Sequence, residues 1–146
     1  DYHLDQVLFT EKDFDITDFE GEPAQPIGER RNKRSPLHDV AGMLRSFDYA
    51  ALTALRSGDF RTENLKNFGV VAKAWVFWVS AVFLQHYLEV SRRDDFLPAS
   101  NQELKSLLDV LLLHKAIYEL NYEVNNRPDW IAVPLRGILG ILQPAG

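Results

Sequence analysis

Residues 63–92 constrain the fold of this chain more than any other stretch. Between residues 68 and 84 the side chains are apolar on nearly every face of a helix, and Lys73 carries the one charge. A membrane span needs about 20 mostly apolar residues, whereas a shorter helix that is apolar all round usually lies at the centre of a domain. The sequence therefore predicts a long buried helix, with Trp75 and Trp78 in the core and no membrane span.

A second helix is predicted over residues 35–58. Ser35 suits the N-cap, Pro36 suits the first helical position, and Asp39 complements the helix dipole in the first turn. Gly58 suits the end of the helix. The apolar face of this helix consists of Val40, Leu44, Phe47, Ala51 and Leu55.

A third helix is predicted to begin at Ser100, because Ser100 and Glu103 match a capping box. The Asn-Asn-Arg-Pro sequence at 125–128 ends it, since the residue before a proline disfavours helix. A short last helix is expected over residues 134–142. The stripe along the third helix consists of Leu104, Leu108, Leu111, Tyr118 and Tyr122.

The first twenty residues predict a β-hairpin instead. Residues 6–10 read as one strand, and residues 14–19 alternate apolar with polar side chains, which is typical of a half-buried strand. A loop over residues 21–34 follows. The fold class is therefore mainly α with a small β-hairpin, in a single domain over residues 1–146.

Composition narrows the function classes. The net charge of −5 argues against general nucleic-acid binding. The absence of cysteine excludes disulfides and thiolate chemistry, and it agrees with a cytoplasmic location. A basic run lies within the loop, at Arg30, Arg31, Lys33 and Arg34. We expect it to be a solvated loop tied to Glu22 and Glu29, with a role near nucleotide phosphates left open.

The opening stretch carries the candidate chemistry. Kinase-type enzymes place an Asp that accepts the substrate proton, an amide side chain five positions later that helps to hold Mg²⁺, and a second metal-binding Asp after a hairpin. Asp1, Gln6 and Asp18 follow this order. Carboxylate and amide oxygens suit Mg²⁺. The alternative from spacing alone is a surface hairpin with scattered carboxylates.

Longer blocks of sequence support the kinase interpretation. They are Asp1-Tyr2-His3-Leu4-x-Gln6-Val7-Leu8, Asp18-Phe19-Glu20-Gly21-Glu22-Pro23, the stretch from Glu29 to Phe47, and Glu119-Leu120-x-Tyr122-Glu123-x-Asn125-Asn126-Arg127-Pro128-x-Trp130. Together these blocks resemble the maltokinase family along essentially the whole chain. One departure is Asp5, which stands where that family usually has glycine.

The resemblance implies the C-terminal lobe of a protein-kinase-like fold. Residues 1–34 would form the catalytic loop, hairpin and basic loop, and residues 35–146 the helical bundle. The implied activity is phosphorylation of maltose to maltose 1-phosphate with ATP and Mg²⁺, often in fusion with trehalose synthase. The nucleotide-covering N-terminal lobe has no counterpart in the sequence, so we expect the chain to be a fragment, cut before Asp1, that is inactive alone.

The resemblance also assigns roles to individual residues. Asp1 would be the catalytic base, with His3 orienting its loop, and Gln6 and Asp18 would bind the metal and the nucleotide phosphates. The sugar would contact three residues, Tyr118, Tyr122 and, more weakly, Arg136. Spacing alone favours the alternative that both tyrosines continue the core stripe from Leu111.

Several alternatives stay open. His38, His86 and His114 are too scattered in the sequence for a metal site. The chain could instead be a non-catalytic carbohydrate-binding or structural module that supports a trehalose synthase domain. A third possibility keeps the kinase fold but changes the acceptor, for example to glucosamine.

Overall fold

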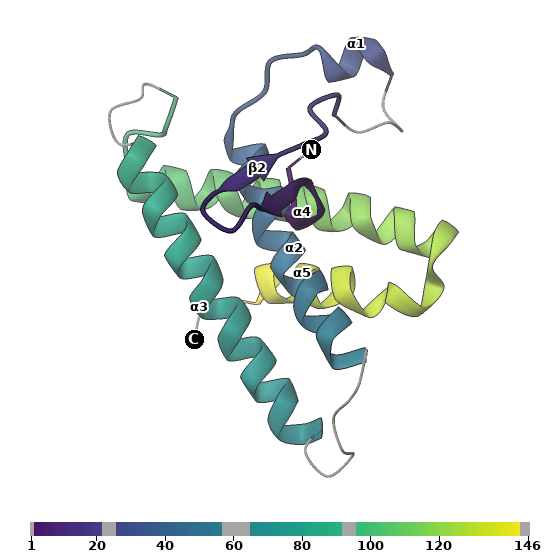
Figure 1. Ribbon diagram of the computed structural model, residues 1–146. Helices are drawn as coiled ribbons and strands as arrows, with labels where there is room; N and C mark the ends of the chain where they lie inside the picture. The colour runs from purple at the N-terminus through teal and green to yellow at the C-terminus, as the bar shows by residue number, and fades with distance from the viewer. Residues whose placement is uncertain (1, 22–25, 57–64, 92–95, 144–146) are drawn as a thin grey trace.

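The computed structural model describes residues 2–21, 26–56, 65–91 and 96–143, with the side chains of 65–68 left aside. It is mainly helical with one antiparallel hairpin, which confirms the predicted fold class (Figure 1). The elements are η1 (Leu4–Gln6), β1 (Val7–Phe9), β2 (Phe14–Ile16), α1 (Ile27–Arg30), α2 (Leu37–Arg56), α3 (Leu65–Ser91), α4 (Asn101–Asn126), η3 (Pro128–Trp130) and α5 (Ala132–Leu142).

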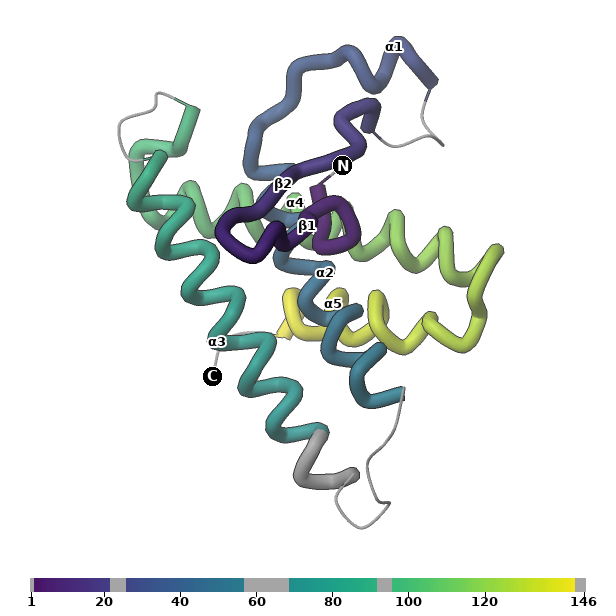
Figure 2. The backbone as a smooth tube through the Cα atoms, in the orientation of Figure 1, coloured from purple at the N-terminus to yellow at the C-terminus, as the bar shows by residue number. Residues whose placement is uncertain are grey.

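Helix α2 lies in the middle of the fold. It packs against α3, α4, α5 and η1, and Figure 2 shows it passing between α3 on one side and the α4–α5 pair on the other. Ser35 caps it as predicted, because the Ser35 Oγ accepts a hydrogen bond from the Leu37 amide at 3.3 Å. The predicted end at Gly58 lies outside the described residues.

The hydrophobic core forms where α2 crosses α4. Leu37, Val40 and Ala41 of α2 are buried against Leu108 and Leu111 of α4. The last turns of α3 cover this cluster through Phe83, Leu84 and Tyr87, which are partly buried. Burial of such side chains is worth about 1.5–3 kcal/mol each, so this crossing fixes how the helices are placed around it.

The predicted start of α4 is also confirmed. Ser100 has extended backbone, and its Oγ accepts a hydrogen bond from the Glu103 amide at 3.1 Å. The helix ends at Asn126, and the short helix η3 with Pro128 at its start turns the chain into α5. Helix α5 then packs back along α4 (Figure 1).

The prediction that α3 is a buried central helix is wrong. Helix α3 lies at the edge of the fold, and none of the residues in the apolar stretch Gly69–Ser91 is buried apart from its last residue, Ser91. Trp75 makes an edge contact with Phe47 but is 45% exposed, and Trp78 is 65% exposed. Because α3 is apolar on all sides, its sequence does not indicate which of its faces packs against the rest of the protein. In the structure its main contact is with α2.

The same helix has the length and composition of a membrane span. Among the described residues, Gly69–Ser91 is the one such segment. A single helix that passes this test is a weak indication, because the mostly buried core helices of soluble proteins pass it too, although no part of the tested window is buried here.

The hairpin forms as predicted, but it is not half-buried. Val7 pairs with Ile16 and Phe9 with Phe14, whose rings lie 5.4 Å apart. Every residue of β2 is exposed. The alternating pattern therefore reflects contacts between the two strands rather than burial against helices.

The loop after the hairpin contains a short helix, α1, that the sequence does not predict. The expected pairing of the basic run with Glu29 is confirmed, because Arg34 Nη2 lies 3.1 Å from Glu29 Oε2. Glu22 lies outside the described residues.

Candidate active site

The N-terminal segment is held directly on α2. A β-carbon added to Gly42 would lie only 2.6 Å from the Tyr2 carbonyl oxygen, so a residue without a side chain is required at this crossing. Two residues later, the Leu4 amide donates to Ser46 Oγ at 3.3 Å. These contacts place the start of the chain over the middle of α2. Asp1, the predicted base, lies outside the described residues.

Gln6 and Asp18 come together at the base of the hairpin. Gln6 is buried, and its backbone carbonyl oxygen accepts a hydrogen bond from the Thr17 backbone amide at 2.9 Å. Its Nε2 donates to Asp18 Oδ2 at 3.5 Å. Asp18 adopts a left-handed backbone with φ of 62°, a conformation that aspartate enters more readily than most residues other than glycine.

These two side chains fit the donor set of a magnesium ion. Mg²⁺ typically binds one or two carboxylates together with substrate phosphates and water, rather than a cage built only of protein groups. Gln6 offers an amide oxygen and Asp18 a carboxylate, and the Gln6 amide would have to turn its oxygen toward Asp18, because its Nε2 faces the carboxylate in this structure. No group of three His, Cys, Asp or Glu side chains suited to a metal occurs within the described residues.

His3 lies at the N-terminal end of η1, beside Asp5. The His3 Nδ1 is 4.0 Å from Asp5 Oδ2, and the Asp5 side chain is almost fully exposed. An ion pair in that environment contributes little to stability. His3 is half-buried and faces the cavity described next.

A cavity of about 770 Å³ opens between η1, α2, α4 and η3. It is large enough for a disaccharide, since small-molecule sites span roughly 300–1,000 Å³. His3, Tyr118 and Tyr122 all line it, so the structure brings together three of the predicted site residues. Arg136 is exposed on α5 and is not among the lining residues, so its contact with sugar stays a prediction.

The floor of this cavity carries two buried glutamates from α4. Glu119 Oε2 accepts hydrogen bonds from Arg45 Nε at 2.9 Å and from Arg45 Nη2 at 2.7 Å. Burial raises the pKa of Glu119 above its ordinary value, although Arg45 acts in the opposite direction. Each carboxylate is paired with an arginine, because Glu123 accepts hydrogen bonds from Arg127 at 2.7 and 3.0 Å.

Tyr49 of α2 completes the second pair. Its hydroxyl donates to Glu123 Oε1 at 3.0 Å. Burial, followed by the nearby Glu119 and Glu123, raises the pKa of Tyr49 far above its ordinary value, so the phenol stays neutral and acts as a donor.

Aromatic rings and guanidinium groups form one wall of the cavity. The Tyr49 and Trp130 rings stack with centroids 6.2 Å apart and planes 16° apart. Arg127 lies over both Tyr122 and Trp130, at 5.3 and 5.4 Å from their ring centroids. Flat aromatic surfaces next to hydrogen-bonding groups suit the apolar faces and hydroxyls of a pyranose.

Sequence reasoning noted Glu119 and Glu123 only as carboxylates beside the two tyrosines, and it missed Lys115, Arg127 and Tyr49. Lys115, Glu119, Glu123 and Arg127 recur every four positions, which places them along one side of α4 and its end. That spacing was a usable signal beside the two tyrosines. Tyr49 gave no such signal, because its role depends on the packing of α2 against α4.

Two known proteins are similar to this chain in sequence. A glucosamine kinase from Streptacidiphilus jiangxiensis is 28% identical over 134 residues, which cover 92% of this chain and 28% of that protein. Both of these relatives are glucosamine kinases, which are sugar kinases. A glucosamine kinase from Mycolicibacterium smegmatis (strain ATCC 700084 / mc(2)155) is 27% identical over 92% of this chain and 31% of that protein.

A solved structure has a similar fold. A glucosamine kinase in complex with glucosamine, ADP and inorganic phosphate matches 98% of this chain with a TM-score of 0.78 and 25% identity, over 32% of its own length. The chain thus spans about a third of the length of its relatives. No protein-family model matches it. The comparisons support a sugar kinase in general and not a maltokinase in particular.

Proposed function

We propose that this chain is the acceptor-binding lobe of an ATP-dependent sugar kinase that acts in the cytoplasm. The observation that carries the proposal is the cavity of about 770 Å³, lined by aromatic rings and paired charges, beside the segment that bears Gln6 and Asp18. The relatives support the reaction class, and the similar solved structure is a glucosamine kinase in complex with glucosamine, ADP and inorganic phosphate.

The proposed reaction transfers the terminal phosphoryl group of ATP to a sugar hydroxyl. The hydroxyl oxygen bonds to the γ-phosphorus while the bond from that phosphorus to the bridging oxygen breaks and ADP leaves. Asp1 accepts the hydroxyl proton, and His3 holds the loop that carries it. Gln6 and Asp18 would hold Mg²⁺, which neutralises charge on the phosphates. The aromatic wall orients the acceptor so that one hydroxyl faces the phosphate.

We propose maltose as the acceptor, with maltose 1-phosphate as the product. Both buried glutamates of the cavity already accept hydrogen bonds from arginines, Glu119 from Arg45 and Glu123 from Arg127, although Arg45 is shared with Asp48. The choice of maltose rests on the resemblance of the sequence blocks to maltokinases and on a cavity large enough for a disaccharide. A trehalose synthase domain in the same protein would supply such a substrate. Glucosamine remains the second candidate, because it is the acceptor named for the relatives.

The test uses the full-length protein and measures ATP consumption with maltose, glucosamine and glucose as acceptors. We expect turnover with maltose to exceed turnover with glucosamine. Asp18→Asn should abolish turnover with every acceptor while leaving maltose binding intact. Unchanged turnover in that variant would support a non-catalytic module instead, and turnover by residues 1–146 alone would contradict the need for a second lobe.

A further inference from the structure

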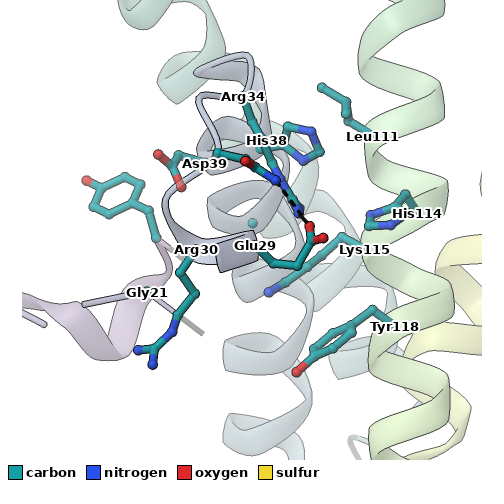
Figure 3. Close-up of a pocket in the computed structure, with 13 residues that line it drawn as sticks. Gly21, Glu29, Arg30, Arg34, His38, Asp39, Leu111, His114, Lys115 and Tyr118 are labelled. Carbon is teal, nitrogen blue, oxygen red and sulfur yellow. Dashed lines mark hydrogen bonds and ion pairs between the residues drawn. The ribbon is translucent and has the colours of Figure 1, made fainter. Parts of the chain in front are cut away.

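A second cavity, of about 290 Å³, lies on the other side of Lys115 and Tyr118. It is bounded by Gly21, by the segment from α1 to α2, and by the middle of α4 (Figure 3). Lys115, Tyr118 and Gly42 line both cavities, so the two sites share a wall. The proposed transfer reaction assigns no role to this second cavity.

Cationic side chains reach this cavity from three parts of the chain. Arg30 comes from α1, Arg34 from the segment before α2, and Lys115 from α4. In Figure 3, Arg34 and Lys115 extend toward the middle of the group. Two carboxylates, Glu29 and Asp39, also line it, so cations outnumber anions.

Glu29 does not offset the cations fully. It is engaged by Arg34 at 3.1 Å and by Asn32 at 3.4 Å, both through Oε2. A guanidinium has five N–H donors in a planar fork, so a single carboxylate oxygen leaves most of the donors of Arg34 available for a second acceptor.

Arg30 supplies an independent indication of a ligand. Its Nη1 donates to the Glu20 carbonyl at 3.2 Å, but its Nε is buried and lacks a hydrogen-bond partner in the described part of the chain. Buried donors are almost always satisfied, and an unmet charged donor is costly. In Figure 3 the Arg30 guanidinium lies on the Gly21 side of the group, away from Arg34 and Lys115, so a bound oxyanion would meet this N–H group once the Arg30 side chain turns toward the cavity.

Two imidazoles add to the polar lining. His38 of α2 and His114 of α4 meet edge to face, with ring centroids 6.1 Å apart. Burial, then Arg34 and His114, lowers the pKa of His38, while Asp39 acts in the opposite direction. The sequence treats these histidines as scattered, and the fold brings them together in one cavity.

We propose that this second cavity binds a phosphoryl group, either as inorganic phosphate or as the phosphate of a phosphorylated sugar. Guanidinium forks bind phosphate oxygens in pairs, and a lysine adds a point charge. A sugar phosphate could place its ring in the larger cavity and its phosphate across the Lys115 wall. Binding of inorganic phosphate does not depend on the proposed kinase function. Binding of a sugar phosphate rests on that function, because the sugar phosphate is the product of the proposed reaction.

The first experiment is calorimetric titration of the full-length protein with inorganic phosphate. Arg30→Met keeps the apolar stem against Gly21 and removes the donors. Because the substitution removes charge-assisted hydrogen bonds to the phosphate, we expect the Kd for phosphate to rise about tenfold or more. Arg31→Met is the matched control, because Arg31 is an exposed cation of the same loop that does not line the cavity.

A measurement on the unmutated protein keeps the test independent of folding. A bound phosphate should raise the pKa of His38, which NMR titration of the imidazole would follow. Saturable binding that depends on Arg30 and raises the pKa of His38 supports the site. Absence of saturable binding, or an equal loss in Arg30→Met and Arg31→Met, overturns it.

The two sources of phosphate are separated by comparing ligands. Tighter binding of a sugar 1-phosphate than of both inorganic phosphate and the free sugar identifies the ester, and equal binding of the ester and inorganic phosphate identifies the free ion. Asp18→Asn separates this proposal from the kinase proposal. It should abolish turnover and leave phosphate binding unchanged, so each can fail without the other.

Discussion

Arg45 of α2 and Glu119 of α4 are joined by two hydrogen bonds to a single carboxylate oxygen, at 2.7 and 2.9 Å. The Arg45 side chain is 4% exposed, and its Nη1 also lies 2.7 Å from Asp48. The pair links the helix that carries the N-terminal segment to the helix that lines the cavity. The contact between these two helices and the candidate site therefore share one largely buried ionic network.

Removal of Arg45 should destabilise the fold strongly. Breaking a buried ion pair leaves an uncompensated charge and costs about 3–5 kcal/mol. We expect Arg45→Met to lower the free energy of unfolding by this amount in urea denaturation. Lys105→Met is the control, because Lys105 pairs with Asp109 at the surface, where such pairs are worth about 0–1 kcal/mol. Similar losses in both variants would contradict a special role for Arg45.

The penalty in Arg45→Met should shrink as the pH falls. Burial raises the pKa of Glu119 and of Asp48 in the folded protein, and Arg45 opposes both shifts. Without Arg45 the folded pKa values rise further, so the folded state binds protons more tightly than the unfolded state does. The variant therefore loses stability as the pH rises through the pKa values of these two carboxyl groups in the folded state. It regains stability as the pH falls toward their unfolded-state pKa values, near 4. Urea denaturation of both proteins between neutral pH and about pH 4.5 measures this. A difference that is independent of pH would argue against it.

Gly137 of α5 lies against the same arginine. A β-carbon at this position would overlap the Arg45 guanidinium. Gly137→Ala should therefore destabilise by about 1–3 kcal/mol through overpacking, even though alanine favours helix. Gly140→Ala on the same helix meets nothing within 4 Å and should be neutral or slightly stabilising. Thermal unfolding of both variants compares them, and equal melting temperatures would contradict the clash.

Gly42→Ala should affect activity more than stability. Its β-carbon would push against the Tyr2 carbonyl, a backbone atom that cannot rotate away, and displace the N-terminal segment. Because a misplacement of about 1 Å can cost roughly a hundredfold in rate, we expect kcat in the full-length protein to fall by that order. Gly28→Ala, which meets nothing within 4 Å, is the control. A variant with normal kcat would show that the crossing does not position catalytic groups.

Local signals in the sequence predicted the elements well. Ser35 and Ser100 each cap a helix through bonds within a few residues, so their effect is independent of tertiary packing. The hairpin register likewise depends on neighbouring strands. The exposure of Trp78 could not be predicted in this way, because it depends on where α3 lies relative to α2.

The candidate site was predicted unevenly for the same reason. Tyr118 and Tyr122 were found through helical spacing and family resemblance, and both line the larger cavity. Tyr49 and Arg45 become relevant only through partners 74 positions away in the chain. No local sequence pattern predicts such a pairing. The meeting of His38 with His114 was missed in the same way.

Helix α2 divides its surface among three neighbours, with Gly42 under the N-terminal segment, Arg45 against α4 and α5, and Phe47 toward α3. A substitution on α2 therefore disturbs several contacts at once. Tyr122 and Trp130 lie in α4 and η3 at the edge of the cavity and are partly exposed. New acceptor preferences should accordingly evolve by exchange at these edge positions, while α2 stays nearly invariant among proteins that share this lobe but phosphorylate different sugars.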